Sequence, residues 1–209
     1  MKLAGLSGAI GSGKSTVAAL LAERGAVVVD VDVLLRELQQ RGRPVFAAMV
    51  ERWGTRVVGA DGELDRQAVA DIVFNDRTEL AALHALTNEP VEEEIYARVS
   101  AHHDSDRVVV LEAALLLGAA GLYGTRGLLV VDAPEESAIT RLVVSRGMPE
   151  ADARARLENQ PSRDVRLRHA DLVIDNSGTP DELLPQVERA WTWLRSLPDG
   201  EVQRRLPPA

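Results

Sequence analysis

Short apolar runs alternate with segments of helical periodicity along this chain. Five runs have the length and the nearly continuous hydrophobicity of strands buried in a parallel sheet: residues 3–6, 26–30, 107–111, 127–132 and 170–175. Apolar positions three and four apart predict helices over 14–24 and 33–41, after Pro134, and from 179 to about 197. This alternation predicts an α/β fold, with a five-stranded parallel sheet between layers of helices.

Between the second and third runs, residues 44–103 carry a helical pattern throughout. Interruptions are expected at Gly54, at Asp61-Gly62 and at Pro90. The segment is therefore predicted to be a helical insertion, a suitable place to hold an acceptor substrate. Its histidines, His84, His102 and His103, lack the spacing of a zinc site and are expected at the surface or in packing.

Three local features complete the pattern. Residues 113–126 are poor in polar groups, which predicts an irregular helix against the sheet, and residues 198–209 are expected to form a loose tail. Trp191 and Trp193 lie two positions apart on the last predicted helix. Neighbours at that spacing point in different directions, so at most one of them is expected to face the core.

The first apolar run leads into a glycine-rich loop that carries a specific motif. Gly8, Gly13, Lys14 and Ser15 fit the pattern G-x4-G-K-[ST] of the phosphate-binding loop. Glycines let successive N–H groups point at an anion, and the following helix adds its own unpaired N–H groups. Lys14 is expected to neutralise phosphate charge and the Ser15 hydroxyl to bind the Mg²⁺ that accompanies ATP or GTP. The predicted phosphate-binding residues are Gly8, Ala9, Ile10, Gly11, Ser12, Gly13, Lys14, Ser15 and Thr16. A chance match is disfavoured because a strand pattern precedes the loop and a helical pattern follows it.

Carboxylates follow two other predicted strands, at the edge where open α/β sheets bind ligands. The second strand ends in Asp30-Val31-Asp32. Asp30 is expected to cap the next helix. Asp32 is expected to act as a base toward an attacking hydroxyl or as an outer partner of Mg²⁺, with a helix cap as the alternative. Glu112 follows the third strand and is a candidate metal-associated carboxylate, with a helix cap or an ion pair as the alternative.

Arginines gather in residues 141–168 although the chain is acidic overall. Phosphoryl transfer spreads negative charge that arginines on a mobile segment can stabilise, and Arg141 and Arg146 are the preferred candidates for that lid function. Arg154 and Arg156 are expected in surface pairs with acids one helical turn away. Asn176 lies in the turn after the fifth strand and is a candidate contact to a purine base.

Composition narrows the classes of protein. Hydrophobic residues make up 45% and charged residues 27% of 209 positions, which is ordinary for a globular domain. A net charge of -8 argues against a general nucleic-acid binder, and the absence of cysteine excludes disulfides and thiolate-bound metals. No signal-peptide pattern and no apolar run near the roughly 20 residues of a membrane span are found, so a cytoplasmic protein without a membrane partner is expected.

Taken in order, these segments resemble the dephospho-coenzyme A kinase family of P-loop kinases over about residues 3–195. The resemblance lies in the loop, in Val-Asp-Val-Asp with Leu-Leu-Arg-Glu, and in Gly-Glu-Leu-Asp-Arg-Gln-Ala-Val with Ile-Val-Phe-Asn-Asp. It continues in Val-Val-Asp-Ala-Pro-Glu-Glu, Asn-Gln-Pro-Ser-Arg and Ala-Asp-Leu-Val-Ile-Asp-Asn-Ser-Gly.

The resemblance implies a substrate and a layout for the chain. The reaction would transfer the γ-phosphate of ATP, with Mg²⁺, to the ribose 3′-hydroxyl of dephospho-coenzyme A, the last step of coenzyme A synthesis. Asp32 would be the base, Lys14 the phosphate-binding lysine and Arg141 the lid arginine, while Arg146 is a further candidate for binding ATP. The expected layout is one P-loop kinase domain, a monomer or weak homo-oligomer. Its parts are a core of residues 1–42, 104–140 and 169–197, an acceptor-binding insertion (43–103), a lid (141–168) and the tail (198–209).

Three departures from the family pattern keep alternatives open. Ala9 replaces a glycine of the loop, Asn88-Glu89-Pro90 stands where a His-Pro pair is common, and Ala114 to Gly118 lack the usual proline, aromatic residue and carboxylate. The two larger changes concern the acceptor side. The alternatives are a relative that phosphorylates another nucleoside or sugar hydroxyl, and a relative that binds nucleotide without transfer.

Overall fold

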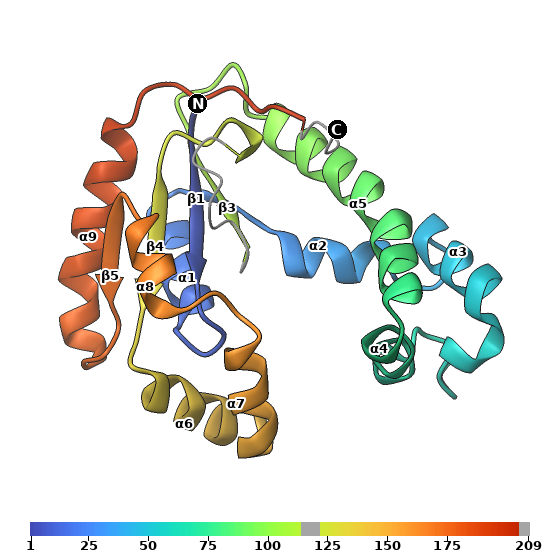
Figure 1. Ribbon diagram of the computed structural model, residues 1–209. Helices are drawn as coiled ribbons and strands as arrows, with labels where there is room; N and C mark the ends of the chain where they lie inside the picture. The colour runs from blue at the N-terminus through green and yellow to red at the C-terminus, as the bar shows by residue number, and fades with distance from the viewer. Residues whose placement is uncertain (114–121, 205–209) are drawn as a thin grey trace. The chain divides into compact units, whose positions relative to one another are not determined.

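The chain forms an α/β structure with two compact units. The computed structural model describes residues 1–113 and 122–204 and is drawn in Figure 1. One unit comprises residues 1–29 and 99–209, and the other residues 30–98. The predicted insertion, residues 43–103, overlaps the second unit over most of its length.

The described elements alternate between strands and helices in the first unit and are helical in the second. The strands are β1 (Lys2–Gly8), β2 (Val27–Asp30), β3 (Val108–Glu112), β4 (Leu128–Asp132) and β5 (Leu172–Asp175). The helices are α1 (Lys14–Glu23), α2 (Val31–Leu38), α3 (Pro44–Trp53), α4 (Arg66–Asn75), α5 (Arg77–Ser100), α6 (Glu135–Arg146), α7 (Glu150–Glu158), α8 (Arg163–Arg168) and α9 (Pro180–Ser196), with short 3-10 turns η1 (Gly54–Val57) and η2 (Leu122–Gly124).

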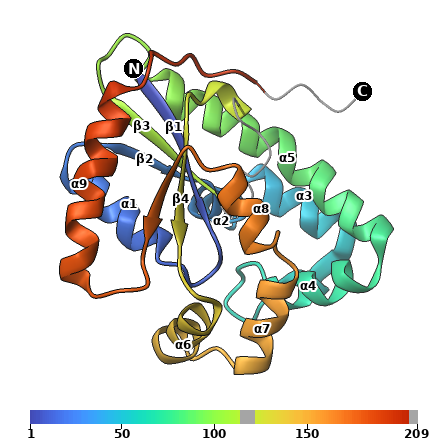
Figure 2. The same ribbon diagram turned by 60° about the vertical axis from the view of Figure 1, so that its left-hand side comes forward.

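The sheet has the order β2-β3-β1-β4-β5, and its strands run parallel. Every residue of β3 and β4 is buried, as a parallel sheet covered on both faces requires. Helices α1 and α9 share one core with the sheet, while α8 contacts β4, and Figure 2 shows α8 on the opposite face. The prediction of a layered α/β fold with a five-stranded parallel sheet is confirmed, with strand ends shifted by one or two residues.

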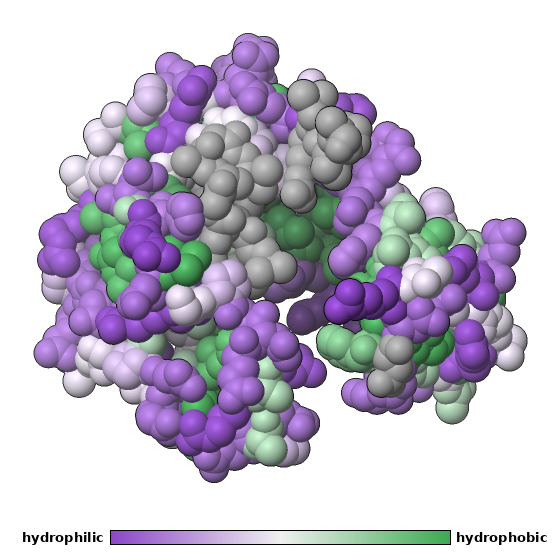
Figure 3. Space-filling model, in the orientation of Figure 1, coloured by the Kyte–Doolittle hydropathy of each residue, from purple (hydrophilic) through white to green (hydrophobic). Residues whose placement is uncertain are grey.

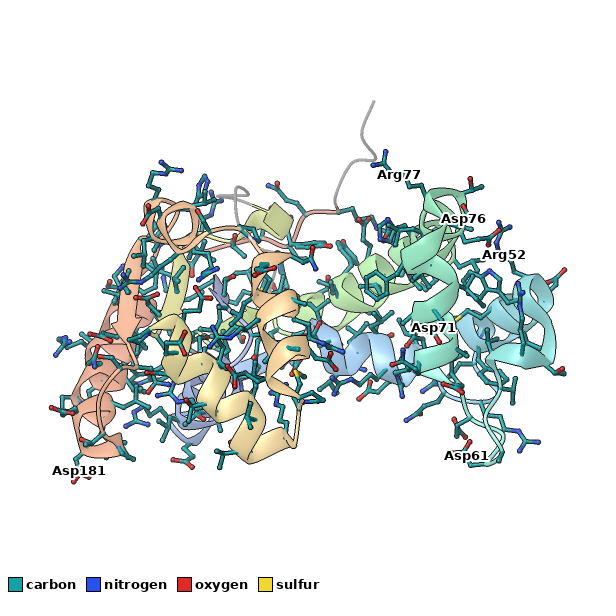
Figure 4. The ribbon with its side chains drawn as sticks, turned by 60° about the horizontal axis from the view of Figure 1, so that its bottom comes forward. Arg52, Asp61, Asp71, Asp76, Arg77 and Asp181 are labelled. Atoms are coloured by element: carbon teal, nitrogen blue, oxygen red, sulfur yellow. The ribbon has the colours of Figure 1, made fainter. Side chains whose placement is uncertain are left out.

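The helical unit has a core of its own. Its buried side chains are Val45, Met49, Trp53, Val57, Leu64, Val69 and Val73. The Trp53 indole N–H donates to Glu79 Oε2 at 2.7 Å, and Arg52 pairs with the same carboxylate. Both hydrogen bonds hold the pKa of Glu79 below its ordinary value, and the one from Arg52 has the larger effect. Other charged side chains of this unit, including those of Asp61 and Arg77, project outward (Figure 4).

Pro90 does not interrupt the helical pattern, and that prediction is wrong. The residue lies inside α5, a helix of 24 residues. A proline removes one helical hydrogen bond, and packing on both sides of it holds the helix together. Leu83 and Leu86 pack on the core of the helical unit, and Ile95 and Val99 are fully buried. No helix in the described ranges has the length and apolar content needed to cross a membrane.

Two expectations about the C-terminal region are also wrong. Trp191 and Trp193 both pack against the sheet core, because the buried stripe of α9 runs between them and each covers one flank. The tail is not loose over 198–204: the N–H of Gly200 donates to Met1 O at 3.0 Å and that of Gln203 to Tyr123 O at 3.0 Å. Residues 205–209 lie outside the described part.

Only part of the segment predicted as an irregular helix, 113–126, can be compared with the structure. Its end forms the 3-10 turn η2. The family departure at residues 114–118 lies outside the described residues.

Candidate active site

The loop between β1 and α1 approaches three other elements closely, and its glycines make this possible. A Cβ on Gly8 would lie 2.4 Å from Val131 O, one on Gly11 2.5 Å from Ala138 O, and one on Gly13 2.1 Å from the Asn176 side-chain nitrogen. All three residues also have positive φ angles, which disfavour any side chain. The loop is thus held against β4, α6 and the turn after β5 (Figure 1).

This loop presents unused hydrogen-bond donors. Among the described residues, no acceptor takes the N–H groups of Gly11, Gly13 or Ser15. Ser12 is 1% exposed, and its hydroxyl has no partner within the described part of the chain. A buried polar group without a partner is costly, so the Ser12 hydroxyl together with these unpaired N–H groups is typical of a site built for an anionic ligand. We call the N–H groups of Gly11, Gly13 and Ser15 the phosphate cradle.

Lys14 places its ammonium group over the start of the loop. Its Nζ donates to Gly8 O at 3.0 Å and to Ala9 O at 3.3 Å. Ser15 and Thr16 lie in the first turn of α1 with exposed side chains, and the N–H of Thr16 donates to Gly13 O. The ammonium, the N-terminal end of α1 and the cradle therefore concentrate positive potential at one place.

Arg141 and Asn176 meet at the carbonyl of Ser12. Arg141 of α6 donates from Nη1 to Ser12 O at 3.3 Å and from Nη2 to Asn176 O at 2.6 Å. Asn176, which follows β5, donates from Nδ2 to the same Ser12 carbonyl at 2.8 Å. Arg141 and Asn176 were both candidate site residues in the sequence, and the structure places both of them at the loop. Arg146 lies exposed in the last turn of α6, and no contact within the described residues joins it to the loop.

Glu112 and Ser15 are the two predicted metal ligands. Glu112 ends β3, is 6% exposed and pairs in register with Leu6 of β1, the strand that leads into the loop. In the described residues no cluster of three or more His, Cys, Asp or Glu side chains could hold a metal by itself. This donor set fits Mg²⁺, which commonly takes one or two protein oxygens and completes its shell with substrate phosphates and water.

Asp30 and Asp32 have different surroundings. Asp30 Oδ1 accepts from the N–H of Val33 at 3.0 Å and so caps α2, as predicted. Because of this cap, α2 begins at Val31, two residues earlier than the sequence pattern suggests. Asp32 lies exposed in the first turn of α2, two residues beyond the carboxyl end of β2.

The structure adds an ion pair that the sequence prediction passed over. Asp132 ends β4, is 5% exposed and accepts a bidentate contact from Arg163, with Nη2–Oδ2 at 2.6 Å. This contact raises the pKa of Arg163 above its ordinary value. The sequence did contain a signal for Asp132, because it is a charged residue at the end of an apolar strand. The same signal identified Glu112 as a candidate.

A cavity of about 270 Å³ lies beside this ion pair. Its lining includes Ala9 of the loop and Gln160, Arg163 and Arg166. Gln160 Oε1 accepts from the N–H of Ile10 at 3.0 Å, which joins the loop to the segment after α7. Arg166 is 8% exposed and donates to Pro161 O, and its burial lowers its pKa. The predicted lid segment therefore does contact the loop, through Gln160.

The surface pairs expected for Arg154 are present. Arg154 contacts Glu150, one turn earlier on α7, and Glu136 of α6. Its hydrogen bond to Glu136 lowers the pKa of that carboxyl. Figure 3 shows hydrophilic side chains over much of the outer surface of α6 and α7, in agreement with solvated pairs. Within the described residues, no ion pair of Arg156 is found.

Comparisons with known proteins agree with the geometry. The sequence profile of a family described as "Dephospho-CoA kinase" matches residues 2–182. The "Dephospho-CoA kinase" of Thermobifida fusca (strain YX) is 40% identical over 204 residues, which cover 97% of this chain and 96% of that protein. The crystal structure of TT1252 from Thermus thermophilus superposes with a TM-score of 0.78 at 32% identity, covering 92% of this chain and 95% of the other. "Dephospho-CoA kinase from Campylobacter jejuni" gives a TM-score of 0.68 at 18% identity, covering 93% and 98%, and supports the fold.

Proposed function

The chain belongs to the dephospho-CoA kinase family, and on that basis we propose that it transfers the γ-phosphate of ATP to the ribose 3′-hydroxyl of dephospho-coenzyme A. The products are coenzyme A and ADP. The observation that carries the proposal is the phosphate cradle, with its unused N–H groups, the buried Ser12 hydroxyl and the Lys14 ammonium. Such a set of donors suits a triphosphate and serves no purpose in packing.

The chemistry needs one proton acceptor and several positive groups. The acceptor oxygen forms a bond to the γ-phosphorus while the bond from that phosphorus to the bridging oxygen of ADP breaks. We assign the departing hydroxyl proton to Asp32, whose exposed carboxylate follows the carboxyl end of β2. Lys14 and the cradle balance the charge on the phosphates. Ser15 and Glu112 would hold Mg²⁺, which supplies further positive charge at the phosphates when bound.

The remaining functional assignments have narrower support. The predicted role of Arg146 in binding ATP stays a prediction. The family supports a small-molecule substrate, and the acidic net charge argues against a general nucleic-acid partner. We also propose a cytoplasmic protein that works as a monomer or weak homo-oligomer.

A second candidate function rests on the acceptor side. Glu89 is exposed on α5 beside Pro90, where the family pattern favours a His-Pro pair. An added carboxylate would disfavour an anionic acceptor by charge repulsion. This substitution keeps open a kinase that acts on another nucleoside or a sugar.

A coupled assay of ADP release with a panel of acceptors tests both candidates. We expect turnover with dephospho-coenzyme A and much slower turnover with adenosine or a simple sugar. Turnover with another acceptor alone would favour the second candidate, and ATP binding without turnover would favour a non-catalytic relative.

The Lys14→Ala variant connects this activity to the cradle. Loss of one preorganised charge is expected to lower kcat/KM by about a hundredfold or more. Lys2 is the chain's other lysine and pairs with Asp199 at 3.1 Å, so Lys2→Ala is the matched control. An equal loss in both variants would mean that the fold rather than the cradle is affected.

A further inference from the structure

We propose that Arg141 and Asn176 are positioning residues, which aim the N–H of Gly13 at the phosphates by holding the Ser12 carbonyl on the opposite side. This inference rests on the proposed nucleotide-binding function and goes beyond it. It gives both residues a task different from touching the base or the transferred phosphoryl group.

The contacts form a closed arrangement around one carbonyl. The Ser12 oxygen accepts from Asn176 Nδ2 at 2.8 Å and from Arg141 Nη1 at 3.3 Å. Arg141 Nη2 also donates to the main-chain oxygen of Asn176 at 2.6 Å, so each of the two residues fixes the other. The donors come from α6 and from the turn after β5, which the sheet holds in place. We call this set of three hydrogen bonds the carbonyl clamp.

The geometry of the peptide unit turns this clamp into a device for aiming a donor. In a trans peptide, the C=O of Ser12 and the N–H of Gly13 point in opposite directions. The peptide bonds of the described residues are trans. Holding the carbonyl toward Arg141 and Asn176 therefore directs the Gly13 N–H away from them, and no described residue accepts its hydrogen.

The neighbouring glycines explain why a clamp is needed. Ser12 lies between Gly11 and Gly13, with φ of 76° and 96°, and glycine allows a peptide unit to rotate at low cost. A rotated Ser12–Gly13 unit would present a carbonyl oxygen to the phosphates, so that repulsion would replace a hydrogen bond. Two donors on the carbonyl, one of them charged, select the productive orientation.

Gly13 itself is adapted to the clamp. A Cβ at this position would lie 2.1 Å from Asn176 Nδ2, closer than any real contact. The glycine thus permits both the positive φ and the close approach of the amide that holds the carbonyl.

Binding of inorganic tripolyphosphate separates this inference from the other possible tasks, because that anion has neither base nor ribose. We expect Asn176→Ala and Arg141→Ala each to weaken tripolyphosphate and ATP by the same factor, on the order of tenfold, in calorimetric titrations. The double variant is expected to lose less than the product of the two factors, since both donors act on one carbonyl.

Matched controls are available in the same unit. Thr192 Oγ1 donates to Glu188 O at 3.1 Å on α9, and Arg195 is exposed on the same helix. Thr192→Ala and Arg195→Ala are expected to leave both affinities unchanged.

Several results would overturn the inference. If ATP binding weakens while tripolyphosphate binding does not, the two residues contact the base or the ribose. If both affinities persist and only kcat falls, they act on the transferred group. A wild type that binds neither ligand would contradict the proposed function as well, whereas a wild type that binds both, with variants that do the same, contradicts the clamp alone.

A measurement on the unaltered protein covers the case in which the variants do not fold. In protein labelled with ¹⁵N-glycine, the Gly13 amide resonance is expected to shift strongly on addition of tripolyphosphate. A resonance that stays in place would show that this N–H does not donate to the anion, and the inference would be overturned.

Discussion

Two aspartates at the start of α2 show how neighbouring carboxylates take different tasks. The side-chain oxygen of Asp30 accepts a hydrogen bond from the N–H of Val33, so Asp30 stabilises the start of the helix. Asp32 lies in the first turn of the same helix and is exposed. Asp30 occupies the cap position of the helix and Asp32 does not. Mutation of Asp30 is therefore expected to change stability, and mutation of Asp32 to change activity.

Replacing the two aspartates should therefore separate stability from activity. Asp30→Ala is expected to lower the free energy of unfolding by about 1 kcal/mol, because the cap is lost, with turnover per folded molecule retained. Asp32→Asn is expected to preserve stability and ATP binding while lowering kcat by about a hundredfold, because the base is lost. Urea unfolding and the ADP-release assay measure both quantities. Full activity in Asp32→Asn would remove this residue from the mechanism.

Helix α9 illustrates how an element is fixed at its end as well as along its face. Thr179 and Glu182 form a reciprocal capping box at its start, and Leu183, Val187 and Leu194 bury its inner face against the sheet. The hydrogen bond from the Thr179 N–H, followed by that from its hydroxyl, lowers the pKa of Glu182 below 4.5. The carboxylate is thus favoured in the folded state.

The sign of this shift predicts a pH dependence for the cap. A lowered pKa contributes stability above the ordinary value, and this contribution is lost as the pH falls through the folded-state value. We expect wild type to melt above Glu182→Gln at pH 7 and the difference to shrink as the pH falls below the ordinary pKa of a glutamate.

The adjacent acid provides the control for the charge itself. Asp181 lies in the same first turn of α9 (Figure 4), and its side chain is not part of the capping box. Asp181→Asn removes the same charge near the helix end without breaking the cap. If both variants give the same pH-dependent difference in melting temperature, the helix dipole rather than the cap is responsible.

At the scale of the whole molecule, the two compact units have separate cores and separate fluorescent probes. Trp53 is 3% exposed in the core of the helical unit, whereas Trp191 and Trp193 pack on the core around the sheet. These are the chain's three tryptophans. The phosphate cradle belongs to residues of the sheet unit alone.

Ligand binding should therefore stabilise the units unequally. Tripolyphosphate at a hundredfold excess over its Kd is expected to add about 2.7 kcal/mol to the sheet unit. The urea midpoint seen by Trp191 and Trp193, in Trp53→Phe protein, should rise more than that seen by Trp53 in Trp191→Phe/Trp193→Phe protein. Equal shifts would indicate that the two units unfold as one cooperative structure.

The sequence by itself determined the strands, the glycine loop and the cap of α2. Each of these depends on residues close together in the chain: a buried strand needs a short apolar run, the loop needs glycines and a lysine at fixed spacing, and a cap needs an acceptor three residues before its donor. Membership of a kinase family could be predicted for the same reason, because its motifs consist of residues close together in the chain.

Only the tertiary structure decided the rest. Asn176 and Arg141 meet Ser12 from 164 and 129 positions away, and Arg163 reaches Asp132 from 31. Such pairs leave no periodic trace, because their partners are set by how strands and helices pack rather than by spacing. The same holds for Pro90 inside α5 and for the docked tail, where packing and main-chain hydrogen bonds supplied by distant residues outweigh local preference.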